Sequence, residues 1–171
     1  GPGRDTLFLS ELDFHYQRDG ASITGEVALS PALVGHDGWP LASLLATIGD
    51  VMLGTLANAI SDSLPLTSDL NHHTFHPTGV QPIRAIGEMT KVGRTLIVGE
   101  IRFHDPDDRL VAYCSAGFLG SPRPDDLRYD NTPVDLIRFG DGSGPAFTER
   151  FDRFLGIRVT APGVAEAPRR D

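Results

Sequence analysis

One long apolar helix is the feature that most constrains how this chain can fold. Pro40 stands where a first helical turn would begin, and no strong helix breaker follows until the 61–65 segment. Large apolar residues recur at helical spacing and predict one buried stripe, made of Leu41, Leu44, Leu45, Ile48, Met52 and Leu56.

A second helical stripe carries small residues and one carboxylate. The small residues are Ser43, Ala46, Thr47, Gly54 and Ala57, and the carboxylate is that of Asp50. Such a smooth surface lets a ligand or another backbone come near, so Asp50 is a candidate functional residue. An exposed helix charge is the common alternative for an Asp at this spacing.

Runs of strand-like sequence flank the predicted helix. The 7–16 stretch has no decisive period, and Arg18-Asp19-Gly20 then turns the chain into an alternating run. The alternating and strand-like runs are residues 22–29, 66–75, 83–91, 95–104 and 110–119. The order predicts an α+β fold in which one long helix packs against a strongly bent antiparallel sheet.

Composition narrows the class of partners. The chain has 171 residues, 40% of them hydrophobic, which suits one globular domain with extras. Its net charge of −8 argues against nucleic acid or an anionic membrane as the main partner. We expect no membrane span, no metal and no cofactor, and the lone Cys114 excludes an intrachain disulfide. These features are typical of a cytoplasmic protein.

Three sequence blocks within residues 7–120 resemble the hotdog-fold acyl-CoA thioesterases of the phenylacetate-pathway (PaaI-like) group. They are Leu45-Ala46-Thr47-Ile48-Gly49-Asp50, then Thr67-Ser68-Asp69-Leu70-Asn71 with Phe75 and Pro77, then Lys91-Val92-Gly93-Arg94-Thr95-Leu96 followed by Asp108-Arg109-Leu110-Val111-Ala112. Each block is weak alone, but their order and spacing are specific. The resemblance implies a hotdog fold and hydrolysis of an acyl-CoA thioester to a free acid and a thiol.

The resemblance also assigns roles to individual residues. It implies that Asp50 is the general base or nucleophile and that Thr67 helps to hold the attacking water. It further implies that the acid of one subunit meets the strand residue of its neighbour across a dimer interface. One bent sheet around one helix also leaves edge strands and the small-residue helix face unburied, which predicts a homodimer, alone or paired into a tetramer. Where the family usually has His-Gly-Gly, this chain has Leu41-Ala42-Ser43. We therefore expect the backbone amides of Ala42 and Ser43 to be the oxyanion donors. Their side chains leave the thioester oxygen less room to approach these amides than the glycines of the family would.

Several residues are candidates for binding the rest of the substrate. Lys91 and Arg94, beside Gly93, could meet the phosphates of coenzyme A, although solvated hairpin charges are the commoner case. The candidates for lining an acyl tunnel are Trp39, Phe75, Met52 and Tyr113. His76 is interpreted as a histidine at the rim of the substrate pocket. A zinc site is disfavoured, because adjacent strand residues such as His72 and His73 point to opposite faces.

Two other functions compete with hydrolysis. A hotdog dehydratase or hydratase pairs a loop His with a helix acid, and His36 precedes Asp50 at a spacing of that kind. The segment 69–73 also mimics part of a hydratase signature, but it follows the central helix instead of preceding it. The other rival is a non-catalytic module that binds an acyl group or acyl-CoA and has lost the chemistry.

The sequence divides into three parts. Residues 4–120 form the predicted hotdog domain, after a Gly1-Pro2-Gly3 start that reads as a cloning scar. Residues 121–146 are rich in Pro, Gly and Asp and are predicted to be a linker. Residues 147–171 form a C-terminal extension. Its apolar pair, Leu-Gly-Ile-x-Val run and Gly turn resemble the start of a second hotdog domain, and a self-contained extension that covers the sheet is the alternative.

Overall fold

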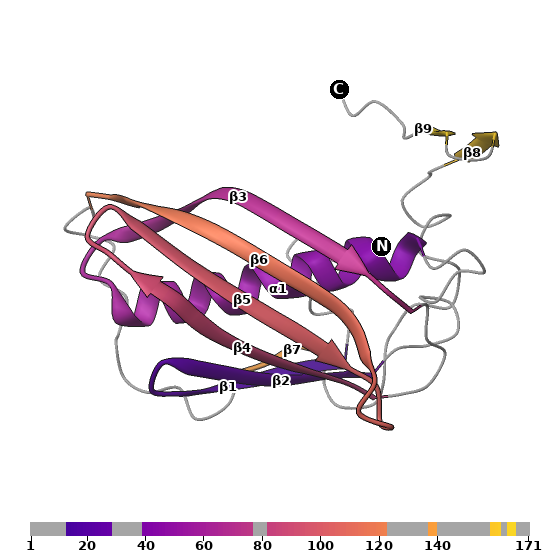
Figure 1. Ribbon diagram of the computed structural model, residues 1–171, viewed down its shortest axis with the longest axis horizontal. Helices are drawn as coiled ribbons and strands as arrows, with labels where there is room; N and C mark the ends of the chain where they lie inside the picture. The colour runs from indigo at the N-terminus through magenta and orange to yellow at the C-terminus, as the bar shows by residue number, and fades with distance from the viewer. Residues whose placement is uncertain are drawn as a thin grey trace, which may run out of the picture.

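The computed structural model describes residues 13–28, 39–76, 82–122, 137–139, 158–161 and 164–166. Helix α1 (Trp39–Ile60) lies against a bent seven-stranded sheet that curves around it (Figure 1). The strands of this sheet are β1 (Asp13–Asp19), β2 (Ser22–Ala28), β3 (Leu64–Thr74), β4 (Ile83–Val92), β5 (Leu96–His104), β6 (Leu110–Ser121) and β7 (Ile137–Phe139). The predicted α+β fold, with a long central helix wrapped by an antiparallel sheet, is confirmed.

The strand order is β3-β6-β5-β4-β2-β1-β7, and every neighbouring pair is antiparallel. Strands β2, β4 and β5 alternate buried and more exposed residues, so one face of the sheet packs on α1 and the other faces outward. Strand β3 forms one edge of the sheet beside α1 (Figure 1). This edge is where the helix and a long exposed strand meet.

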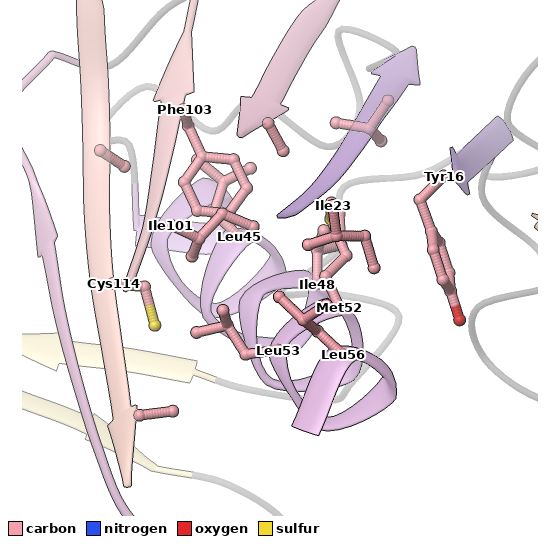
Figure 2. Packing of buried hydrophobic residues seen from close by; sticks show 14 of the residues in the cluster. Tyr16, Ile23, Leu45, Ile48, Met52, Leu53, Leu56, Ile101, Phe103 and Cys114 are labelled. Atoms are coloured by element: carbon pink, nitrogen blue, oxygen red, sulfur yellow. The ribbon is translucent and has the colours of Figure 1, made fainter. Parts of the chain in front are cut away.

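The apolar stripe of α1 forms the centre of the core, as predicted. Leu44, Leu45, Ile48, Met52 and Leu56 are fully buried, and the side chain of Leu41 lies outside the described residues. Figure 2 shows this side of α1 packed against residues of the sheet that include Ile23, Ile101 and Phe103. Ala57 belongs to this core and not to the exposed small stripe, because Leu53 and Ala57 widen the buried face.

Helix α1 bears on the expectation that the chain has no membrane span. By length and composition alone, Ala42–Ile60 is long and apolar enough to cross a bilayer. In the structure this segment is the central helix, and its largest apolar side chains contact the sheet. A core helix of this kind passes the same test as a membrane span, which makes the match weak evidence.

Short strands occur in both C-terminal ranges. Ile137–Phe139, inside the predicted linker, forms β7 and pairs with β1, so this part of 121–146 extends the sheet. A three-residue strand is too short for sequence periodicity to reveal. In the range 147–171, β8 (Arg158–Ala161) and β9 (Val164–Glu166) pair antiparallel as a separate two-stranded sheet. A second hotdog domain stays a prediction, and residues 1–3 lie outside the described residues.

Candidate active site

Asp50 and Thr67 meet at the edge of the sheet. Asp50 lies half-buried in the middle of α1, and Thr67 lies on β3, opposite the buried Phe118 of β6. The Thr67 hydroxyl donates a hydrogen bond to Asp50 Oδ1, with an oxygen–oxygen distance of 2.9 Å. Both predicted catalytic side chains are therefore in direct contact.

This contact lies within one chain. Within one chain the acid and the strand residue already meet, and the contact between subunits that the resemblance implied stays a prediction. The physical reason for the contact within one chain is the short connection between α1 and β3, residues 61–63, which returns the chain along the helix so that Thr67 comes level with Asp50.

A cavity of about 270 Å³ opens next to the pair. It is lined by Asp50, Val51, Gly54, Thr55, Asn58, Leu64, Pro65, Thr67 and Phe118. Apart from Asp50 and Thr67, these residues were not predicted to border a substrate pocket. The signal was available on α1, because residues 50, 54 and 58 follow one another at a spacing of four and share a helix face.

The three predicted acyl-tunnel residues whose side chains the structure describes, Met52, Phe75 and Tyr113, do not line this cavity. Met52 is fully buried in the core on another face of α1, and Phe75 is exposed just after β3. Tyr113 donates a hydrogen bond to Glu100 on the outer face of the sheet, at 2.9 Å. The side chain of Trp39 lies outside the described residues. A helical or strand period shows which residues share a face of an element, but it does not show which of these faces borders a cavity.

The predicted oxyanion donors lie far from Asp50 along the helix. Ala42 and Ser43 are the fourth and fifth residues of α1, so the Ser43 amide belongs to the regular hydrogen-bond ladder and that of Ala42 stands at its margin. Ser43 precedes Asp50 by seven residues, which a helix spans in about 10 Å. The amides and the carboxylate of one chain therefore cannot contact the same thioester carbonyl.

The predicted coenzyme A residues fall into two separate places. Lys91, Gly93 and Arg94 share the β4–β5 turn, where the Gly93 amide donates to the Leu96 carbonyl at 3.0 Å. A side chain at Gly93 would collide with that carbonyl, which explains the glycine. A cavity of about 570 Å³ opens beside the turn and is lined by Ile60, Ser61, Asp62, Ser63, Val92, Gly93, Arg94, Gly120, Ser121 and Pro122.

His76 does not join the residues of this turn within one chain. Leu66 of β3 lies level with Leu96 at the start of β5, since both are paired with Leu119. His76 follows Leu66 by ten residues, or about 30 Å of extended strand. His76 is thus at the opposite end of β3 from Arg94.

Two groups on β6 and β3, Cys114 and His72, have shifted pKa values. Burial raises the pKa of the Cys114 thiol to about 12, and the negative charge of Asp50 adds to this rise. Burial lowers the pKa of His72, and the neighbouring His73 lowers it further. His72 is paired with the buried Cys114, whereas His73 is exposed and paired with Tyr113, so they occupy opposite faces. Across the described ranges, no three His, Cys, Asp or Glu residues gather as a metal site.

Comparison with known proteins gives structural relatives only. No protein-family model matches the chain, and no curated protein matches it. A Q32A mutant of the thioesterase SAV0944 from Staphylococcus aureus subsp. aureus Mu50 resembles it with a TM-score of 0.56 at 13% identity, covering 61% of this chain and 89% of that one.

Two further solved structures match over more of the chain. The protein smu.793 from Streptococcus mutans UA159, bound to acetyl-CoA, has a TM-score of 0.59 at 10% identity and covers 72% of this chain and 98% of its own. The candidate thioesterase yhdA from Lactococcus lactis has a TM-score of 0.58 at 17% identity, and the match covers 69% of this chain and 100% of that one. At these identities the likeness shows the fold alone, and this chain has the hotdog fold that its sequence predicted.

Proposed function

We propose that this protein hydrolyses an acyl-CoA thioester, with Asp50 as its general base or nucleophile. The observation that carries the proposal is the 2.9 Å hydrogen bond between Thr67 and Asp50 at the mouth of a cavity. The fold supports it, since structures with this fold include the thioesterase SAV0944 and a protein bound to acetyl-CoA.

In the proposed reaction, Asp50 takes a proton from water while the water oxygen adds to the thioester carbonyl carbon. The carbon–sulfur bond then breaks, and the leaving thiolate takes up a proton to give coenzyme A and the free acid. Thr67 donates to one carboxylate oxygen, which leaves the other oxygen to accept the proton. If Asp50 attacks the carbonyl directly, water hydrolyses the resulting anhydride and the products are the same.

The oxyanion donors are proposed to come from a second copy of the chain. The amides of Ala42 and Ser43 lie about 10 Å along α1 from Asp50 of the same chain, so one chain leaves the site incomplete. Strand β3 is an exposed edge of eleven residues that carries the exposed side chains of Leu66 and Leu70. A long exposed edge of this kind is suited to pairing with another chain. We propose a homodimer, alone or paired into a tetramer, with Ala42 as the better-placed donor.

The coenzyme A phosphates are proposed to bind at the β4–β5 turn. Lys91 and Arg94 are exposed there, and the cavity beside them also contains Ser61 and Ser63. This cavity neighbours the Asp50 cavity along the chain. Asn58 and Leu64 line the Asp50 cavity, and the residues between them that line the second cavity include Ile60 and Ser63. His76 fits this role only if a second copy brings it near the turn.

The decisive experiment measures thiol release from a panel of acyl-CoA esters by the wild type and by Asp50→Asn. We expect the variant to be slower by roughly a hundredfold or more, the usual scale for losing a positioned acid or base. Asp107→Asn, an exposed turn carboxylate, is the matched control and should match the wild type. Equal rates for Asp50→Asn and the wild type would overturn the assignment of Asp50.

The same panel separates the rival functions. If the wild type interconverts enoyl- and hydroxyacyl-CoA but releases no thiol, the dehydratase or hydratase interpretation replaces this one. Binding of acyl-CoA without any turnover identifies a non-catalytic module. Sedimentation of the active protein tests the assembly, and a fully active monomer would contradict the composite site.

A further inference from the structure

An irregularity in β3 decides which face of the sheet Thr67 occupies. From the end of the strand backwards, Thr74, His72 and Leu70 are paired with Ala112, Cys114 and Ala116. All three partners are buried, so the even-numbered residues in this half of β3 lie on the same face of the sheet as the core. Thr67 is odd-numbered, yet it is paired with the buried Phe118 and contacts Asp50 on the same inner face.

The inward-facing residues change from even-numbered to odd-numbered at a β-bulge between Thr67 and Asp69. Two residues, Ser68 and Asp69, stand opposite the single residue Gly117 of β6. Without the bulge, regular alternation from Leu70 would place Ser68 on the inner face and turn Thr67 outward, away from Asp50. The bulge therefore accounts for the Thr67–Asp50 contact.

Side chains at the bulge hold it in place. Ser68 Oγ lies 3.1 Å from the Gly117 carbonyl oxygen and 3.1 Å from Asp69 Oδ1, and its single hydroxyl proton is shared between these two acceptors. The Asp69 carboxylate lies over Gly117, where any added Cβ would collide with it. Asn71 donates a longer bond, 3.5 Å, to Asp69 Oδ2. The absence of a side chain at Gly117 is thus required for the Asp69 carboxylate to lie in this position.

We propose that Ser68, Asp69 and Gly117 form a positioning device that holds Thr67 against Asp50. These three residues act on the reaction only through Thr67, and the inference rests on the proposed function of the Asp50–Thr67 pair. The bulged register competes with a register slipped by one residue, in which Ser68 would replace Thr67 on the inner face. Fixing the bulge selects the register in which the hydroxyl that faces Asp50 belongs to the β-branched Thr67 and not to Ser68.

The test uses Gly117→Ala, whose new methyl group displaces the Asp69 carboxylate. We expect kcat for acyl-CoA hydrolysis to fall about tenfold, the scale for losing a hydrogen bond to a charged group, with KM nearly unchanged. The same substitution should have no further effect on kcat when Thr67 is already Val, since both changes act through one hydroxyl. Additive losses in the double variant would overturn the proposal.

Matched variants separate positioning from a general loss of stability. Ser115→Ala changes the same outer face of β6 two residues away from Gly117 and should leave kcat unchanged. Should Gly117→Ala fold poorly, Ser68→Ala removes the donor without adding atoms and should give the same kcat loss. A lowered melting temperature with unchanged kcat in either variant would also overturn the proposal.

A crystal structure of the Gly117→Ala or Ser68→Ala variant decides the inference without any activity. We expect Thr67 Oγ1 to move beyond hydrogen-bond distance of Asp50 Oδ1. Retention of the 2.9 Å contact would overturn the positioning role even if the wild type hydrolyses acyl-CoA. Conversely, a wild type that hydrolyses no thioester would overturn the proposed function, while this structural result would still report on the bulge.

Discussion

The Thr67 hydroxyl donates to Asp50 Oδ1 across a distance of 2.9 Å, joining an edge strand to the central helix of the same chain. Asp50 and Thr67 also both line the adjoining cavity, so the pair borders whatever occupies it. Because the two side chains come from different elements, their contact depends on the register of β3 as well as on the rotation of α1.

The contribution of this hydroxyl can be isolated with two substitutions. Thr67→Val keeps the β-branched shape that suits a strand but removes the donor, and we expect kcat for acyl-CoA hydrolysis to fall about tenfold. This loss is smaller than that expected for Asp50→Asn, because water can partly orient itself. Thr67→Ser restores a hydroxyl and should recover most of the rate in the same assay. A Val variant as fast as the wild type would contradict the role of Thr67.

Local pattern explains how much of this site the sequence could predict. The 3.6-residue period of α1 fixes Asp50 opposite the apolar stripe, and strand alternation fixes the inner and outer faces of β4 and β5. The period of α1 singles out Asp50, whereas Thr67 is predicted only through the resemblance to the hotdog thioesterases. The helix and strand patterns depend on neighbours within a few residues, so a single sequence is sufficient to find them.

What the sequence could not predict depends on pairing between distant segments. The bulge at Ser68 reverses the alternation inside one strand, and its cause is a glycine on β6. The distance of His76 from Arg94 likewise follows from the direction and length of β3. Strand β7 is stabilised by the edge of β1 and has no pattern of its own.

The β4–β5 turn gives a prediction about the coenzyme A end of the substrate. Arg94→Gln should raise KM for acyl-CoA roughly fivefold, as expected for losing an exposed charge pair, and leave kcat nearly unchanged. The effect should vanish with an acyl N-acetylcysteamine thioester, which has no phosphates. Arg84→Gln is the control, since Arg84 is exposed and pairs with Asp108 in the turn that follows β5. Equal effects of both variants would remove Arg94 from the binding site.

Cys114 gives a prediction about pH. Burial raises the pKa of its thiol from about 9 to about 12, so the folded state holds this proton more tightly than the unfolded state. The resulting stabilisation is complete below about pH 9 and is lost as the pH rises toward 12. We expect the free energy of unfolding to fall more steeply with pH in this window for the wild type than for Cys114→Ser. Parallel urea-denaturation curves across the window would contradict this.

Gly54 gives a prediction in which stability and activity change in opposite directions. A glycine inside a helix costs about 0.5–1 kcal/mol relative to alanine, and a Cβ at Gly54 would meet only Phe118, at 3.7 Å. Gly54→Ala should therefore raise the free energy of unfolding by about that amount. The same methyl group enters the cavity beside Asp50, so kcat/KM for acyl-CoA should fall, and Gly54→Leu should lower it further.

Gly49 is the matched control for these opposite changes in stability and activity, because it lies on the same helix but packs against the core. A Cβ at Gly49 would come within 3.1 Å of Cys114 Sγ and 3.3 Å of Ile101, so Gly49→Ala should lower the free energy of unfolding. Chemical denaturation and steady-state kinetics on both alanine variants provide the comparison. If Gly54→Ala is more stable and equally active on every acyl-CoA tested, the space beside Gly54 does not hold substrate.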